Sequence, residues 1–371
     1  MDFDFSDDQQ QLRDAVARWV EKSYGFERRK QIVNAGGFDR AVYDELAGLG
    51  LTGIYVGEDH GGLGMGPVEA MVVLEELGRG IALEPLAQAF VASAVIGAHG
   101  GSEVKNAWLP KIASGQALVA LAHQERKARY RLDVCEAKAA ITGSGYAVTG
   151  LKNIVPAGDQ ADAFIVPAVL DGKLALFLVE RTAKGVSARG YLTQDEARAA
   201  DVKLDSAPAF LITANGLDAL TYAVDVGIAC ACAEGVGAMD RFLAMTVQYM
   251  NQRKQFGVPI ASFQALRHRV ADMKMQLELA RGMSYYATLK LNAPAAERRQ
   301  ALSRAKVQLG QSMRYVGQQG VQLHGGIGVT DEYAGSHYFK RLTQLEMAYG
   351  DTMHHLGEVS QRMTASAGVF A

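Results

Sequence analysis

The chain has 371 residues, which is enough for two or three packed subdomains and for an enzyme. Its 38 Lys and Arg residues against 40 Asp and Glu residues give a formal charge of −2, which excludes a general electrostatic attraction to nucleic acid or to an anionic membrane. Three cysteines, an acidic start (MDFDFSDDQQ) without an apolar signal region, and no run of about 18 apolar residues predict a soluble cytoplasmic chain without a disulfide framework.

Helical patterns dominate residues 1–118, which we predict to form an all-helical N-terminal domain. Ser6 is followed by two acidic residues and by apolar residues spaced three and four apart as far as Val20, the pattern of an N-capped amphipathic helix. A further helix is predicted over residues 71–77, ending near Gly78. The glycine-rich GGLG at 61–64 precedes it as a turn.

The pattern changes to β-rich over residues 119–215, the predicted middle domain. Alternating segments occur at 146–149, 163–166 and 174–179, with turns predicted at 143–145 and 171–172. Short strands at this spacing predict an antiparallel sheet, either a sandwich or a small barrel.

The helical period returns over residues 216–371, the predicted C-terminal domain. One apolar stripe runs from Leu220 to Met245, and two more patterns cover residues 263–291 and 301–323. Long helices joined by short links predict a bundle, so the fold class is α+β.

Two segments of this bundle carry candidate ligand-binding residues. In RKQFGVPIASFQ, Arg253 has the geometry to bind a phosphate, Phe256 to stack on a base and Gln264 to contact polar edges. The local alternatives are an arginine favoured by the helix dipole and an aromatic core residue. In QLHGGIG, three glycines in four residues predict that another group approaches the backbone closely, which is compatible with a helix cap and turn.

Taken in order along the whole chain, four features resemble the acyl-CoA dehydrogenase family. They are GIYVGEDHGGLG with EELGR, the β-rich middle, RKQFGVPIASFQ and QLHGGIGVTDEY. The resemblance implies an all-helical N-terminal domain, a middle antiparallel β-domain and a C-terminal four-helix bundle that together enclose FAD. It also implies an acyl-CoA substrate and self-association as a dimer or as a tetramer built from two dimers.

The same resemblance assigns cofactor roles to individual residues. Arg253 is expected at the FAD pyrophosphate. Gln322, Gly325 and Gly326 are expected to contact FAD that is bound mainly to a neighbouring subunit. The predicted FAD-binding residues are Arg253, Gln255, Phe256, Gln264, Gln322, Gly325, Gly326 and Thr352. No metal site is predicted.

The chain departs from the family at two places where hydroxyl groups usually touch the flavin. A T-E-P type segment is replaced by Leu121-Ala122-His123-Gln124, and a W-I-T type segment is replaced by Asn153-Ile154-Val155-Pro156. His123 is a candidate replacement donor, with a structural role at a strand end as the alternative.

The catalytic glutamate of the best known members is also missing. In Ala348-Tyr349-Gly350-Asp351-Thr352, Gly350 stands where that glutamate is expected. Asp351 is the candidate substitute, and its alternative role is to cap the helix that follows. Some relatives carry the glutamate near the start of the first long bundle helix, where the nearest acids are Asp225 and Glu234. His354 and His355 are adjacent on a helix and face different ways, so we expect no metal pair.

Three hypotheses follow. The first is a FAD-dependent acyl-CoA dehydrogenase that uses Asp351, or else Glu234 or Asp225, as its base. The second is a non-catalytic partner subunit for a paralogous dehydrogenase chain that carries the glutamate, as the GDxxHH-type ending suggests. The third is a flavin oxidase or monooxygenase on the same fold. The sequence specifies neither the acyl group nor the electron acceptor.

Overall fold

The computed structural model describes residues 5–143 and 145–366. The chain forms two compact units. The first unit comprises Met1–Arg29, Met71–Ala82 and Ile228–Ala371, and the second comprises Lys30–Ala70 and Leu83–Gly227.

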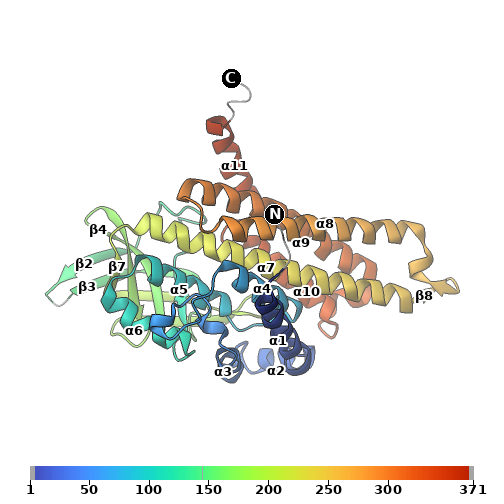
Figure 1. Cartoon of the computed structure of the whole chain (residues 1–371), viewed down its shortest axis with the longest axis horizontal. Coiled ribbons are helices and arrows are strands. Elements are labelled where there is room, and N and C mark those ends of the chain that lie inside the picture. Colours follow the sequence, from blue (N-terminus) through green and yellow to red (C-terminus); the bar gives the residue numbers. More distant parts are fainter. Residues whose placement is uncertain (1–4, 144, 367–371) are drawn as a thin grey trace. The chain divides into compact units, whose positions relative to one another are not determined.

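Helices dominate the part of the chain that lies outside residues 119–213 (Figure 1). Before the strands, the α-helices are α1 (Asp7–Ser23), α2 (Phe26–Asn34), α3 (Arg40–Gly48), α4 (Pro67–Arg79), α5 (Leu86–His99) and α6 (Ser102–Ala113), with short turns η1 (Leu51–Gly53) and η2 (Glu58–His60). After the strands come α7 (Gly216–Gln252), α8 (Gln264–Lys290), α9 (Ala295–His324), α10 (Ala334–Met347) and α11 (Thr352–Ser366), with short turns η3 (Ile260–Ser262) and η4 (Gly325–Val329).

Local chemistry explains where these helices begin. Ser6 caps α1 in a reciprocal capping box with Gln9, as its position before two acidic residues predicted. Helix α8 matches its predicted range within one residue at each end. Helix α9 begins six residues before the predicted 301, directly after Pro294. Its first six residues, AAERRQ, include no large apolar side chain, so the apolar periodicity did not reveal them.

The second unit contains a closed ring of strands. The strands are β1 (Val119–Leu121), β2 (Lys138–Thr142), β3 (Gly145–Pro156), β4 (Ala163–Leu170), β5 (Lys173–Glu180), β6 (Val186–Leu192) and β7 (Arg198–Thr213). Neighbours pair in the order β4-β2-β3-β7-β5, and β5 pairs with β4 again, which closes a small barrel. Strands β1 and β2 pair with β4 in parallel, whereas the other pairings are antiparallel.

The turn between β4 and β5 lies where the sequence predicted it. Asp171 and Gly172 both have positive φ, 48° and 79°, which is the backbone of a two-residue hairpin turn. Alternate strand residues such as Phe164, Val166 and Phe177 fill the barrel core. The other turn that we predicted, at 143–145, includes Ser144, which lies outside the described residues.

Helix α9 is central to the helical part of the first unit and packs against α8, α10 and α11. Small residues permit these close approaches. A Cβ atom at Gly320 would overlap the ring of Phe242 in α7, and a Cβ atom at Gly310 would overlap Thr352 at the start of α11. The helical, β-rich and helical succession confirms the predicted α+β fold class.

One helix meets a criterion for membrane spans that the sequence reading did not apply. No run of about 18 uninterrupted apolar residues occurs, as expected, but α7 is long and apolar enough, by length and composition alone, to cross a membrane. Its most apolar window is 89% buried inside the protein. Buried core helices pass the same test of length and composition, because packing against protein requires the same apolar side chains as packing against lipid.

Candidate cofactor and active site

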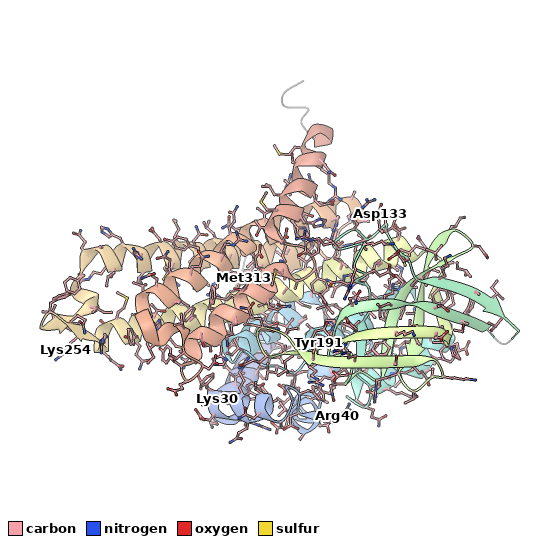
Figure 2. The ribbon with its side chains drawn as sticks, turned by 180° about the vertical axis from the view of Figure 1, so that it is seen from behind. Lys30, Arg40, Asp133, Tyr191, Lys254 and Met313 are labelled. Atoms are coloured by element: carbon pink, nitrogen blue, oxygen red, sulfur yellow. The ribbon has the colours of Figure 1, made fainter. Side chains whose placement is uncertain are left out.

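A hairpin at the end of α7 presents the first group of predicted cofactor residues. Strands β8 (Lys254–Gln255) and β9 (Val258–Pro259) pair across a turn made by Phe256 and Gly257, with φ of 54° and 80° (Figure 2 labels Lys254). A positive φ is costly for an aromatic residue, and the Phe256 side chain is 91% exposed. The sequence therefore holds an aromatic ring in solvent on a strained turn, which is unfavourable unless a ligand or another chain covers the ring.

Arg253 and Gln264 flank this hairpin. Both side chains are exposed, and the Arg253 guanidinium has no hydrogen-bond or ion-pair partner among the residues that the structure describes. Gln264 is the first residue of α8. The Arg253 cation is therefore available for an anionic ligand.

The QLHGGIG stretch lies beside the same end of α7. The rings of Tyr249 in α7 and His324 in α9 have centroids 4.6 Å apart, so the two helices end side by side. Gln322, Gly325 and Gly326 are exposed here. Gly325 has a φ of 65°, whereas a Cβ atom at Gly326 would have nothing within 4 Å. The chain's own packing therefore does not require a glycine at position 326.

Thr352 lies elsewhere. It follows Gly350 at the start of α11 and packs against Gly310, which precedes His324 by 14 residues on α9, or about 21 Å at 1.5 Å per residue. Its backbone N–H and hydroxyl both donate to Glu346 Oε1, at 3.0 and 2.6 Å. The structure thus gathers the other predicted cofactor residues at one end of the bundle and places Thr352 apart from them.

The gathered residues fit a dinucleotide chemically. A cation and bare glycine backbone suit a diphosphate, an exposed ring suits a planar base, and exposed amides suit its polar edges. FAD combines these groups. Phe256 and Gly326 support the fit most directly, because the Phe256 ring is 91% exposed despite an edge-on contact with Phe263, and no packing contact requires a glycine at position 326.

Imidazole rings fill the space beside Gly350. A Cβ atom at this buried residue would lie 2.6 Å from Nε2 of His355 and 2.7 Å from Cδ2 of His354. The φ of Gly350 is 115°, a conformation that residues with side chains rarely adopt. The expected position of the catalytic glutamate therefore has no room for any side chain.

Asp351 is engaged with its own helix. Its Oδ1 accepts a hydrogen bond from the backbone N–H of His354 at 2.8 Å, the contact of an N-cap residue at the start of α11. This is the capping role that we considered for Asp351 from the sequence. A carboxylate held in this way is directed along α11 and is poorly placed to take a proton from a substrate.

The two remaining candidate acids are also engaged or shielded. Glu234 Oε1 accepts a hydrogen bond from Arg341 Nε at 2.6 Å, and Glu234 is only 7% exposed. Asp225 belongs to the second unit and is fully buried. Neither side chain is placed as a solvent-accessible general base.

One charged residue beneath this region is not among those predicted from the sequence. Lys306 is fully buried in α9, and its Nζ donates to the carbonyl oxygens of Leu345 (3.0 Å) and Glu346 (2.6 Å). Burial lowers the pKa of Lys306 to about 8. A lysine between Leu302 and Leu309 on an otherwise apolar face of α9 was the signal that could have revealed it.

His355 is an uncharged residue that lies near Lys306. Its Nε2 lies 3.1 Å from the carbonyl oxygen of Tyr349, and Nδ1 has no hydrogen-bond partner in the described part of the chain. Burial, with the nearby Lys306 and Arg299 charges, lowers the pKa of His355 to about 2. The ring is therefore uncharged at neutral pH and donates from Nε2 to the carbonyl oxygen.

A buried ion pair in the second unit lies next to segments 121–124 and 153–156, where hydroxyl groups were expected from the resemblance. Lys152 Nζ donates to Glu125 Oε1 at 2.6 Å and to the carbonyl oxygen of Pro167 at 2.8 Å. His123 lies two residues before Glu125, and burial lowers its pKa to about 4. Ile154 has a φ of 52°, which is an outlier for a β-branched residue, and its side chain is half exposed. The neutral His123 ring is compatible with either role that we considered from the sequence.

Comparisons with known proteins agree with this architecture. Residues 6–116 match the family description "Acyl-CoA dehydrogenase, N-terminal domain", and residues 214–364 match "Acyl-CoA dehydrogenase, C-terminal domain". The chain is 32% identical to acyl-CoA dehydrogenase FadE12 of Mycobacterium tuberculosis, over 88% of each chain.

Two solved structures are also similar. One is a variant of the Tcur3481-Tcur3483 steroid ACAD (TM-score 0.90, 28% identity, 97% of this chain and 98% of that one). The other is the ChsE4-ChsE5 complex from Mycobacterium tuberculosis (TM-score 0.89, 27% identity, 98% of this chain and 99% of that one).

Proposed function

Because the chain belongs to the acyl-CoA dehydrogenase family, we propose that it works as one chain of a two-chain, FAD-dependent acyl-CoA dehydrogenase. In this proposal a related chain supplies the glutamate that removes the α-proton, and the present chain contributes cofactor-binding residues. The surroundings of Gly350 carry the proposal, because they leave no space for a base.

The cofactor side of the proposal concerns the end of the bundle. Arg253 holds the pyrophosphate of FAD, while Phe256 and the bare backbone at Gly325 and Gly326 contact its adenosine side. FAD, when bound, accepts the hydride from the β-carbon of the acyl group. The residues of this chain bind and orient the dinucleotide.

The two-chain assembly is supported by the names of two similar structures, each of which joins two proteins: Tcur3481-Tcur3483, and ChsE4-ChsE5, which is described as a complex. A homodimer or homotetramer is the alternative assembly. The free state of Cys135, Cys230 and Cys232 is consistent with a reducing compartment, and we propose a cytoplasmic location.

The test is a comparison of the chain alone with the chain co-expressed beside a family member that carries the glutamate. We expect the chain alone to turn over straight-chain acyl-CoA thioesters poorly, since a missing general base typically costs about 10²- to 10⁴-fold in rate. We expect the co-expressed pair to co-purify with FAD and to be active. Substituting the partner's glutamate with glutamine should then abolish turnover while leaving the complex and its flavin intact.

Asp351→Asn provides the decisive control. Asparagine caps a helix about as well as aspartate but cannot act as a base. If the chain alone turned over acyl-CoA rapidly, and if Asp351→Asn removed that activity without loss of stability, Asp351 would be the base and the two-chain proposal would be wrong.

A further inference from the structure

His324 and Tyr333 close the base of a surface loop. We call residues 325–332 the glycine loop. The Tyr333 hydroxyl lies 2.9 Å from His324 Nε2, and His324 Nδ1 lies 2.7 Å from the carbonyl oxygen of Gly320. A carbonyl oxygen can only accept, so Nδ1 carries the proton. His324 is 2% exposed, and burial lowers its pKa, so the ring is neutral and Nε2 accepts from Tyr333.

Three aromatic rings fix the orientation of His324. Phe242 stacks on it at 5.7 Å between centroids and an interplanar angle of 12°, while Tyr249 and Tyr333 lie at 4.6 and 5.0 Å. Gly320 permits the stacking, because a Cβ atom there would overlap the Phe242 ring. The imidazole therefore has one orientation and one tautomer.

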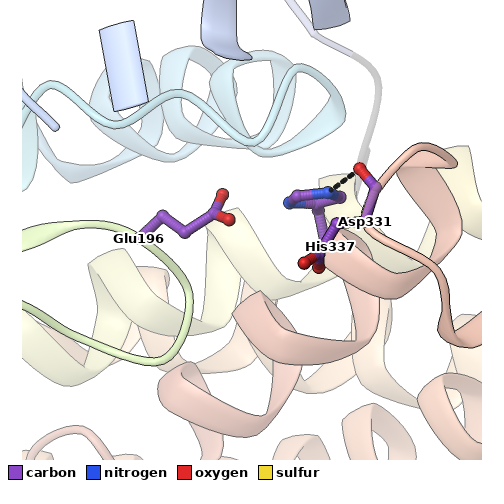
Figure 3. Close-up of side chains that lie close together, drawn as sticks. All are labelled: Glu196, Asp331 and His337. Atoms are coloured by element: carbon purple, nitrogen blue, oxygen red, sulfur yellow. Dashed lines mark hydrogen bonds between the residues drawn. The ribbon is translucent and has the colours of Figure 1, made fainter. Parts of the chain in front are cut away.

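A second histidine, His337, holds the far end of the glycine loop. His337 Nε2 donates to the carbonyl oxygen of Asp331 at 3.0 Å (Figure 3), and its Nδ1 faces Arg29 Nη1 at 3.2 Å. Since an arginine only donates, this Nδ1 accepts. The Ser336 hydroxyl also donates to the carbonyl oxygen of Thr330 at 2.7 Å. Both ends of the loop are thus fixed by side chains beneath it.

Most of the loop has little packing of its own. Val329 is 70% exposed and Ile327 is 44% exposed, and a Cβ atom at Gly325 or Gly326 would meet nothing within 4 Å, whereas Gly328 is buried close to Val321 and His324 of α9. The conformation of its exposed part therefore depends on the bonds at its base and on the contact of Gly328 with α9. Burying the polar imidazole of His324 costs free energy that a phenylalanine of similar shape would not cost. Packing alone therefore does not explain why a hydrogen-bonding ring stands at this position.

We propose that His324 is a positioning residue, which accepts the Tyr333 hydroxyl bond and thereby holds Gly325 and Gly326 where the diphosphate of a bound dinucleotide reaches their backbone. This inference rests on the proposed binding of FAD. His324 does not touch the cofactor; it acts through the shape of the glycine loop.

The first test removes only the closing bond. Tyr333→Phe keeps the ring and deletes the hydroxyl, and Tyr315→Phe is the matched control, since Tyr315 donates to Asp272 (3.4 Å) on the surface between α9 and α8. We expect Tyr333→Phe to weaken FAD binding about five- to tenfold, as measured by equilibrium dialysis of the assembly that holds flavin. Tyr315→Phe should leave the affinity unchanged, and both variants should unfold at similar urea concentrations. Equal FAD affinities for Tyr333→Phe and the wild type would overturn the inference.

The second test addresses the tautomer and the ring directly. Nitrogen NMR of histidine-labelled protein, with His324→Phe used to assign the signal, should report an Nδ1–H tautomer for His324. His324→Phe itself should stay folded and bind FAD at least as weakly as Tyr333→Phe. An Nε2–H tautomer, or wild-type FAD affinity in folded His324→Phe, would refute the positioning role. A wild-type assembly that never holds flavin would instead refute the proposed function, and this inference with it.

Discussion

Restoring the missing glutamate at position 350 should fail for a structural reason. Gly350 is buried, has a φ of 115°, and would place any Cβ atom 2.6 Å from His355 Nε2 and 2.7 Å from His354 Cδ2. The backbone conformation costs a residue with a side chain about 1–2 kcal/mol. Displacing a buried imidazole adds about 1–3 kcal/mol, the usual cost of overpacking. We therefore expect Gly350→Ala to lower the free energy of unfolding by about 2–5 kcal/mol, and Gly350→Glu to lower it further.

The assay is urea unfolding followed by circular dichroism, with Gly357→Ala as the matched control. Gly357 also lies in this segment, inside α11, but a Cβ atom there would meet nothing within 4 Å. Replacing a helical glycine with alanine should stabilise the chain by up to about 1 kcal/mol. A Gly350→Glu protein that unfolded at the wild-type urea concentration and oxidised acyl-CoA on its own would refute this reasoning.

Four further outcomes are expected. Asp351→Ala should lower stability by about 0.5–2 kcal/mol in urea unfolding, whereas Asp351→Asn should nearly retain it. Arg253→Ala should weaken FAD binding about tenfold or more in dialysis, because a charge-assisted contact to a phosphate is lost. Phe256→Asn should relieve the strained φ of 54° and raise stability by up to about 1 kcal/mol while it weakens FAD binding in the same dialysis assay. Burial raises the pKa of Glu75 to about 7, so the folded chain binds a proton on the Glu75 carboxyl more tightly than the unfolded chain does. The free energy of unfolding should therefore fall by about 3 kcal/mol as pH rises from 4.5 through 7. Glu75→Gln should flatten the plot of urea midpoint against pH over this range.

The sequence by itself determined the fold class and the identity of the long elements. Apolar residues spaced three and four apart require a helix with one buried face, which is why α7 and α8 lie where their patterns predicted. The Asp171-Gly172 turn and the Ser6 cap could also be predicted from the sequence, since each depends on a backbone conformation or a hydrogen bond within a few residues. The absence of a glutamate at position 350 was visible in the same way.

Only the tertiary structure decided how these pieces act together. Closure of the barrel depends on strands distant in sequence, because β2 pairs with β4 and β5 pairs with β7. The sequence could not show that imidazole rings fill the space beside Gly350 or that Thr352 donates to Glu346, since both depend on how α11 packs. Tertiary packing also fixed the hydrogen bonds of two buried residues. Lys306 donates to the carbonyl oxygen of Glu346, and His324 donates to the carbonyl oxygen of Gly320 and accepts from Tyr333. Local patterns report a residue's own element, whereas the partners of a buried polar group are set by the other elements that pack around it.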